Sequence, residues 1–283
     1  MCVVFWWLDD SPNEAQPFSF VLVANRDEYF NRESIPAHFW RPVPILAGKD
    51  AVKGGTWLGI TKSGRLATVT NLRQSNGFPP KSRGALVADF LENDEMSPMD
   101  YANKVAVEEN DYAGFNLLLV DIKSASSVYT TNSGVLHSKE KLQKLVPGDA
   151  HGLCNEWLNC PTKKVSQGRI AFENILKRNL SRDGLVSALL DLASDRTQHY
   201  PDDPLTILPS YYPLRLRRQC SSIFIDGLLL RKNDPTSAVG TRTTTVVVVG
   251  KDGNATFVEK TMRKPIKLGK YEWDTQRFDF KLN

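Results

Sequence analysis

The stretch that decides the fold is N-terminal: MCVVFWWL at residues 1–8, followed by FSFVLVANRDE at residues 18–28. Both runs are dense in Val, Phe and Trp, residues that are enriched in β-strands. Pro12 and Asn13 lie between them and are typical of a turn. Two strands joined by so short a connection pair antiparallel. We therefore expect Asn25 to Glu28, at the end of the second strand, to lie beside Cys2 at the start of the first.

Cys2 directly follows the initiator methionine. Because cysteine is a small residue, we expect Met1 to be removed, which leaves the thiol of Cys2 close to a free α-amine. An α-amine has a reference pKa of about 8 and can act as a base near neutral pH. A thiolate is a strong nucleophile, so one residue would hold both nucleophile and base. The alternative is that Cys2 packs as a small apolar side chain.

The remaining pattern is rich in strands at both ends of the chain, with helices between them. We predict further strands at 56–61, 66–71, 114–122, 127–131, 135–138, 220–226, 243–250, 254–262 and 277–282. We predict helices at 82–93, 97–109, 163–180 and 185–192, and a long irregular loop at 194–213, which contains four prolines. Strands and helices do not alternate as they do in a parallel sheet. The order therefore predicts a single α+β domain over 1–283, with two antiparallel sheets face to face and helices outside.

Composition excludes several classes of protein. The 283 residues are 41% hydrophobic and 24% charged, which is ordinary globular usage and excludes a disordered or fibrous chain. The net charge of +4 comes from scattered basic residues, so we expect no nucleic-acid partner. No apolar run is long enough to predict a transmembrane segment. The N-terminus lacks a secretory signal, which predicts a cytoplasmic protein. The cysteines at 154 and 160 have no second pair at zinc-site spacing, so we expect no metal site.

Four motifs, in order, carry a family resemblance: MCVVF at 1–5, ANRDE at 24–28, GGTWLG at 54–59 and GTRT at 240–243. With them, the chain resembles the Asn-Arg-Asp-Glu family of transport-and-Golgi-organisation proteins over nearly its whole length. That family in turn resembles the N-terminal-nucleophile hydrolases, especially the bile-acid and penicillin amidases with an N-terminal cysteine. The resemblance implies their four-layer αββα sandwich.

The same resemblance implies a set of catalytic residues. Cys2 matches the nucleophile of the amidases, and Asp27 matches the aspartate that orients its amine. Asn71 and Asn155 match two asparagines whose amides would stabilise a developing oxyanion, and Arg242 matches a late arginine. Each of these residues also has an ordinary structural interpretation, in a turn or an ion pair.

The sequence departs from the amidases at one position, which weighs against hydrolysis. The amidases carry an arginine three residues before the aspartate, where this chain has Ala24. Arg26 is adjacent to Asp27, so its side chain should point to the opposite face of the strand. As a ligand-binding set we predict Asn25, Arg26, Asp27, Glu28, Trp57 and Arg242.

For function, the resemblance implies a heme-binding and heme-trafficking protein, with links to lipid homeostasis and Golgi organisation. No required cofactor is expected, and heme would be the transported ligand. The residues leave two alternatives open: a thiol amidase or thioesterase that uses Cys2, and a protein that binds acyl-coenzyme A without turnover. An axial heme ligand would come from a Cys, a Met or one of the histidines, which are His38, His137, His151 and His199. The phosphates of coenzyme A would meet basic residues, namely Arg26, Lys53, Arg73, Arg215, Arg217 and Arg218. Transient association with mitochondrial or Golgi membranes is expected from the resemblance alone.

Overall fold

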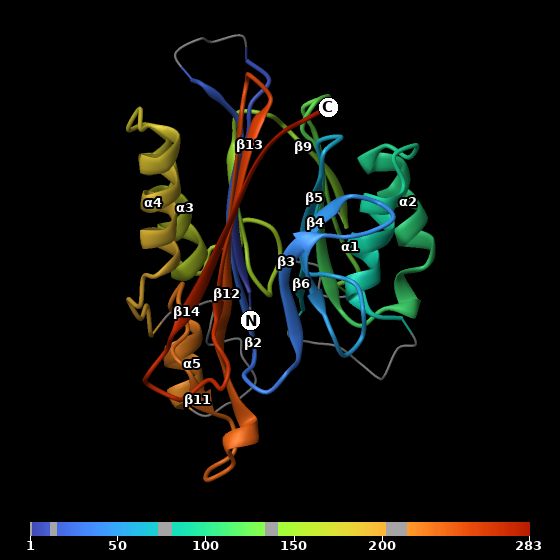
Figure 1. Ribbon diagram of the computed structural model, residues 1–283. Helices are drawn as coiled ribbons and strands as arrows, with labels where there is room; N and C mark the ends of the chain where they lie inside the picture. Colours follow the sequence, from blue (N-terminus) through green and yellow to red (C-terminus); the bar gives the residue numbers. More distant parts are fainter. Residues whose placement is uncertain (1, 12–15, 73–80, 134–140, 202–213) are drawn as a thin grey trace.

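Four layers make up the structure, a computed structural model that describes residues 2–11, 16–72, 81–133, 141–201 and 214–283. Figure 1 shows two β-sheets packed face to face between two layers of helices. Helices α3 (Lys163–Leu176) and α4 (Arg182–Ala193) cover one sheet, and helices α1 (Arg83–Glu92) and α2 (Pro98–Val107) cover the other. The predicted α+β sandwich with helices outside is confirmed.

The first sheet contains the N-terminal pair at its centre. Its strands lie in the order β10 (Ala150–Leu153), β1 (Val3–Leu8), β2 (Phe18–Tyr29), β12 (Ala238–Gly250), β13 (Asn254–Met262) and β14 (Trp273–Lys281), and β11 (Leu228–Leu229) pairs with β12. Every one of these pairs is antiparallel. The chain's two ends therefore combine in one sheet.

The second sheet is a meander in chain order. It comprises β3 (Ser34–Phe39), β4 (Ile45–Asp50), β5 (Leu58–Thr61), β6 (Arg65–Asn71), β7 (Phe115–Asp121), β8 (Ser126–Thr131) and β9 (Leu142–Leu145). A fifth helix, α5 (Leu214–Cys220), lies beyond the end of α4 near β11 (Figure 1). In the described residues, two short 3₁₀ turns, at Glu109–Asp111 and Pro235–Ser237, complete the elements.

Alternation along β1 and β2 assigns their side chains to two different cores. Trp6 and Leu22 pack between the two sheets, whereas Phe5 and Val23 pack beneath α3 and α4. Because successive side chains of a strand point to opposite faces, both faces of these central strands are apolar and buried. We call the face toward the second sheet the inner face and the face toward α3 and α4 the helix face.

A glycine contact joins the β4–β5 connection to the start of α1. Gly55 has a φ of +68°, and a Cβ there would lie 2.5 Å from the carbonyl atoms of Gly84. The backbone amide of Thr56 donates to the carbonyl oxygen of Gly84 at 3.3 Å. The hydroxyl of Ser82 caps α1 by accepting from the amide of Gly84. This contact fixes Arg83, the first residue of α1, beside the β4–β5 connection.

Several segments differ from the sequence prediction. The predicted strand at 220–226 is wrong: α5 ends at Cys220, and an irregular buried segment follows. Ile223, Phe224 and Ile225 are buried, which accounts for their apolar character. The amide of Phe224 donates to the carbonyl oxygen of Asp195, and only Ile225 bonds to β12, through the backbone and hydroxyl of Thr241. The predicted helix 163–180 ends earlier, at Leu176. The strands β3, β4, β9, β10 and β11 and the helix α5 were not predicted, and the predicted strand 135–138 lies outside the described residues.

The last strand begins earlier than predicted, at Trp273, and β12 begins at Ala238. The described part of the irregular loop, 194–201, contains no helix or strand, as expected. Among the described residues, no helix is long and apolar enough to cross a membrane.

Candidate functional site

Cys2 lies where the central strands of the first sheet meet the second sheet. Val3 pairs with Asn25, so one step back along the register brings Cys2 beside Arg26, as the sequence predicts. A cavity between the sheets is lined by Cys2, Ala24 and Arg26 from one side and by Trp57 and Val69 from the other. The cavity is small: its volume of about 10 Å³ has room for about one water molecule.

The environment of Cys2 acts on its thiol in opposite directions. Burial raises the pKa of the Cys2 thiol, and the negative charge of Asp27 raises it further. The backbone amide of Asp27 donates a hydrogen bond to the sulfur, and this contact and the charge of Arg26 both lower the pKa. The net direction is upward, so the thiol is protonated at neutral pH. A nucleophilic role for Cys2 therefore needs a base beside it.

Asp27 is buried on the helix face, behind Cys2. The hydroxyl of Thr241 on β12 donates to its Oδ1 at 2.6 Å. Burial raises the pKa of the Asp27 carboxyl, while the charge of Lys164 and the bond from Thr241 lower it. Lys164 is 4% exposed and lies in the first turn of α3. A buried carboxyl with a buried ammonium near it is suited to holding an α-amine at Cys2.

Asn25 has a structural role in this arrangement. Its Nδ2 donates to the carbonyl oxygens of Ala193 at 2.8 Å and Ile223 at 3.1 Å. Its Oδ1 accepts from the hydroxyl of Thr244 at 2.7 Å. These bonds tie β2 to the end of α4, to the irregular segment after α5 and to β12. Its side chain is therefore held by the protein on the helix face, and Asn25 is also among the residues that line the cavity at Cys2.

Arg26 lies on the inner face and extends over Trp57, with its guanidinium carbon 4.1 Å from the ring centre. Its Nη2 donates to Oδ2 of Asp50 at 3.1 Å and lies 3.5 Å from Oε2 of Glu28. Arg32 also binds Asp50, at 2.6 Å. Within the described chain, Nη1 of Arg26 is buried and has no hydrogen-bond partner. Arg26 thus points away from Asp27, as expected, but toward the cavity that Cys2 lines.

The two predicted oxyanion asparagines lie next to each other, just beyond the end of β10. Val4 pairs with Leu153, the last residue of β10, and Asn155 follows two residues later. Neither asparagine is among the residues that line the cavity at Cys2. Nδ2 of Asn155 donates to the backbone carbonyl oxygen of Asn71 at 2.6 Å. The side chain of Asn71 is exposed, whereas Asn155 is 4% exposed. One amide hydrogen of Asn155 is therefore engaged with the backbone of Asn71.

A buried polar network that the sequence did not predict positions the segment containing Asn155. Asn116 is fully buried, and its Nδ2 contacts the carbonyl oxygens of Cys154 at 3.3 Å and Glu156 at 2.5 Å. The hydroxyl of Tyr129 donates to Oδ1 of Asn116 at 2.8 Å, and the hydroxyl of Thr70 donates to the carbonyl oxygen of Cys154 at 2.6 Å. An asparagine inside an apolar strand, FNLLLVD, is the one sequence signal for this network.

Arg83 is a second cation near Cys2 that the sequence prediction missed. Burial lowers the pKa of its guanidinium, and the negative charges of Cys2 and Glu28 raise it. Its Nη1 donates to the carbonyl oxygen of Gly114 at 3.1 Å. Ala24 leaves the expected arginine position empty, but Arg26 and Arg83 bring positive charge to the same region from different elements.

Arg242 lies in a bulge of β12, between Thr241, which faces Asp27, and Thr243, which faces Arg26. It is 1% exposed. Its Nη1 donates to the carbonyl oxygen of Tyr29 at 3.0 Å and to that of Arg32. Burial and the charge of Arg26 lower the pKa of Arg242 to about 10. Its guanidinium therefore supports the turn after β2 and is directed away from Cys2.

Of the candidate heme ligands, Cys2 lines the cavity, whereas the described histidines lie apart from it. The ring of His151 packs on Trp6, with ring centres 5.2 Å apart, and burial lowers its pKa to about 4. His38 lies on β3, and His199 follows α4. His137 and Arg73 lie outside the described residues. In the described part of the chain, no three His, Cys, Asp or Glu side chains form a group that could hold a metal ion.

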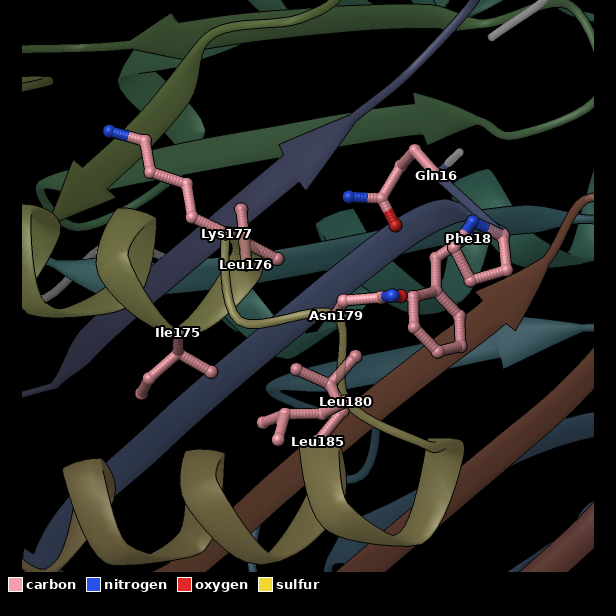
Figure 2. A pocket seen from close by; sticks show the side chains of 9 residues that line it. Gln16, Phe18, Ile175, Leu176, Lys177, Asn179, Leu180 and Leu185 are labelled. Carbon is pink, nitrogen blue, oxygen red and sulfur yellow. The ribbon is translucent and has the colours of Figure 1, made fainter. Parts of the chain in front are cut away.

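Figure 2 shows a second pocket, on the helix face of the first sheet. It lies between the start of β2 and the turn that joins α3 to α4, and its volume is about 220 Å³. Phe18, Ile175 and Leu185 form apolar walls, and Lys177 and Asn179 are polar side chains at its edge. No Cys, Ser or Thr side chain lines this pocket, and none of the predicted site residues contributes to it.

The chain is similar to known proteins in sequence and in fold. Residues 1–264 match the model of the Transport and Golgi organisation 2 family. The mouse Transport and Golgi organization 2 homolog is 31% identical over 100% of this chain and 99% of its own length. The Drosophila melanogaster Transport and Golgi organization protein 2 is 30% identical over 93% of this chain and 92% of its own.

Among solved structures, two amide hydrolases are similar in fold. A conjugated bile acid hydrolase from Clostridium perfringens has a TM-score of 0.47 at 9% identity, covering 100% of this chain and 97% of its own. The Caenorhabditis elegans orthologue of N-acylethanolamine-hydrolyzing acid amidase has a TM-score of 0.44 at 13% identity, and the match covers 87% of this chain and 92% of that protein's chain. The family match over most of the chain and the full-length relatives at about 30% identity lead to one conclusion: the chain belongs to the Transport and Golgi organisation 2 family.

Proposed function

We propose that this protein binds and delivers an amphipathic metabolite, holding its polar end in the cavity at Cys2. The observation that carries the proposal is Nη1 of Arg26, a buried cationic donor that has no partner in the described chain. Leaving such a donor unpaired costs more than leaving a neutral one, because its charge is also removed from water. A carboxylate, phosphate or carbonyl oxygen of a ligand would satisfy it.

The size of the cavity supports the entry of an end group rather than of a whole ligand. Pockets that enclose small molecules usually occupy about 300–1,000 Å³. The space at Cys2 admits about one water molecule. One carboxylate or carbonyl group is of similar size. The apolar body of the ligand would then lie outside the cavity.

Heme is our first candidate for the ligand. One of its propionate carboxylates would pair with Arg26, whose guanidinium is already held over Trp57. Iron ligation within the cavity is not part of the proposal, because a space that admits about one water molecule does not hold the iron at the centre of the heme ring. Acyl-coenzyme A, held without turnover, is the other ligand with the right chemistry, since its carbonyl and phosphates would meet the same cation.

The test is a titration with hemin, followed through the Soret band. The wild-type protein should give a saturable change, and Arg26→Gln should weaken binding by roughly tenfold, the loss expected for one charged hydrogen bond. Arg65→Gln is the matched control, because Arg65 is also buried and stacked, 3.9 Å from the ring of Phe90, but on the second sheet beneath α1. Equal affinities for the two variants, or a change that never saturates, would exclude Arg26 as the anchor.

A second function, acyl transfer by Cys2, is favoured by the position of Asn155 and Asp27. After removal of Met1, the α-amine of Cys2 would take the proton of the thiol, and the sulfur would attack a carbonyl carbon. The side-chain amide of Asn155 would stabilise the oxyanion. Collapse would expel an amine or thiol, which takes back the proton, and water would then release the acyl group from the sulfur. Asp27 would hold the α-amine in place.

Acyl transfer is tested by mass spectrometry of the intact protein after incubation with an acyl-thioester. An added acyl mass on the wild type, absent from Cys2→Ser, would support it, and so would free product that depends on Cys2. Retention of Met1 on the mature protein would exclude this mechanism, because the α-amine would then belong to another residue. Cys160→Ser is the control, since Cys160 is buried away from solvent.

We propose that the protein works in the cytoplasm and contacts organelle membranes transiently. The names of the relatives, which refer to transport and Golgi organisation, support a Golgi connection. Contact with mitochondria and a role in lipid homeostasis rest on the family resemblance alone. Imaging of the tagged protein together with organelle markers would test both locations.

A further inference from the structure

The positive charge of this protein is concentrated at one end. Residues 214–234 and 263–274, which we call the basic end, contain nine Lys and Arg against four Asp and Glu, a net +5. The whole chain has a net charge of +4, so all remaining residues together sum to −1. Figure 1 shows α5, β11 and the connection from β13 to β14 gathered at the same end of the first sheet. The overall charge therefore hides a local patch.

The centre of the basic end is the tight turn between Lys267 and Lys270. The amide of Lys270 donates to the carbonyl oxygen of Lys267 at 3.1 Å, and Gly269 has a φ of +76°. The two lysines face each other across the turn as a bridged pair, and both are exposed. No carboxylate of the described chain forms an ion pair with either. Like charges placed opposite each other are unfavourable, and an anionic partner would remove that cost.

Apolar side chains are exposed among these cations. Leu268, at the tip of the turn, is 42% exposed, and Leu214, at the start of α5, is 52% exposed. Exposed Arg215 and Arg218 flank Leu214 on α5. Leucine surrounded by Lys and Arg is the pattern of surfaces that lie in the headgroup region of a bilayer, where the cations meet lipid phosphates and the leucine enters the acyl boundary.

Packing holds the turn in a fixed position. The hydroxyl of Tyr271 accepts a hydrogen bond from the amide of Gly227 at 2.8 Å. The ring of Phe30 packs edge-on against Tyr271, with ring centres 6.1 Å apart. A Cβ at Gly227 would lie 2.7 Å from Cδ2 of Leu268, so the turn sits directly on this glycine. The turn is therefore rigid before it meets a partner, which lowers the entropic cost of docking.

We propose that the basic end docks on the surface of an anionic lipid bilayer, with Lys267 and Lys270 among the headgroups and Leu268 inserted beneath them. Nucleic acid would also attract the cations but gives no reason for leucine at the tip. The strand β2 ends at Tyr29, next to Phe30, which contacts the turn, and Cys2 lies beside Arg26 of the same strand. Docking would thus place the cavity near the membrane. The proposal does not depend on what the cavity binds.

The test is sedimentation of the full-length protein with vesicles of phosphatidylcholine, alone or with about 30 mol % phosphatidylserine. We expect binding only to the anionic vesicles, weakened by salt. The double variant Lys267→Glu and Lys270→Glu should lower the partition coefficient by roughly tenfold or more. A matched double variant, Lys104→Glu and Lys123→Glu, makes the same charge change at exposed positions on α2 and at the β7–β8 turn, and should bind as the wild type does.

The variant Leu268→Ser distinguishes insertion of the leucine into the bilayer from electrostatic attraction of the lysines to the headgroups. It should leave binding at low salt within about twofold but make it fully reversible by salt, because only the electrostatic part remains. Unchanged thermal unfolding would show that each variant folds. The proposal is overturned if wild-type protein fails to bind anionic vesicles, if both double variants lose binding equally, or if the basic end binds RNA but no vesicle.

Discussion

The two faces of β2 differ sharply at the Asn-Arg-Asp-Glu motif. On the helix face, all the hydrogen-bonding groups of the Asn25 side chain go to Ala193, Ile223 and Thr244. On the inner face, one residue further along, Arg26 keeps an unpaired buried donor beside a cavity. A satisfied buried polar group serves the fold, whereas an unsatisfied one calls for another explanation. One motif thus combines a structural residue and a binding residue in alternation.

The largest expected effect comes from the helix face. Asn25→Leu would leave two buried carbonyl oxygens and one hydroxyl without their partner, which should lower the free energy of unfolding by roughly 3 kcal/mol. Urea denaturation measures it. Asn174→Leu, at an exposed position of α3, should change the same quantity by less than about 0.5 kcal/mol. Similar small changes in the free energy of unfolding of both variants would show that Asn25 has no structural role, and the contrast between the two faces of β2 would be wrong.

The second prediction concerns pH and the inner face. Glu259 on β13 lies opposite Thr245, a lining residue of the cavity, and burial raises the pKa of its carboxyl to about 7. Its folded-state pKa exceeds its unfolded value of about 4.5, so the stabilisation is complete below pH 4.5 and is lost as pH rises through 7. The free energy of unfolding should fall by on the order of 1–3 kcal/mol from pH 5 to pH 8.

Glu259→Gln isolates that contribution. The variant should lack the fall above pH 5, while the titration of His151, whose pKa is lowered to about 4, acts equally on both proteins and cancels in their difference. Parallel pH profiles for the wild type and the variant would show that Glu259 is ionised in the folded state throughout.

A smaller effect is expected from Gly48 on β4. A Cβ there would lie 2.6 Å from the ring of Trp57, so Gly48→Ala should push the ring away from Arg26. We expect about 1 kcal/mol of lost stability from overpacking, together with weaker hemin binding. The measurements are urea denaturation and the Soret titration. Lost stability with unchanged hemin affinity would show that the stacking of Arg26 on Trp57 does not matter for binding.

The sequence predicted the strands that decide the fold because their signals are local. The β1–β2 pair, the strands β5 and β6 and the helices α1 and α2 all follow from patterns of neighbouring residues. The short strands β3 and β4 escaped prediction because Pro36, Gly48 and charged residues interrupt their apolar pattern. The strand predicted at 220–226 was wrong because the apolar residues there are buried without forming a strand.

Only those parts of the site that lie in recognisable sequence motifs were predicted. The approach of Cys2 to residues 25–28 follows from strand pairing, and the neighbourhood of Asn155 and Asn71 was implied by resemblance. Arg83 and Asn116 reach the site from a helix start and from a distant strand, and no spacing in the sequence connects them to Cys2. The direction of Arg242, toward the turn after β2, depends on a bulge that only the structure reveals.

If the cavity at Cys2 is the ligand site, a bound ligand should protect the thiol of Cys2 from chemical modification. Cys2 is partly accessible, whereas Cys154, Cys160 and Cys220 are buried. The rate of iodoacetamide alkylation at each cysteine, followed by peptide mass spectrometry with and without saturating hemin, measures occupancy directly. We predict that Cys2 reacts first and that hemin slows its alkylation by roughly tenfold or more in the wild type but not in Arg26→Gln. An unchanged alkylation rate at Cys2, under conditions where the Soret band shows that hemin is bound, would contradict the account.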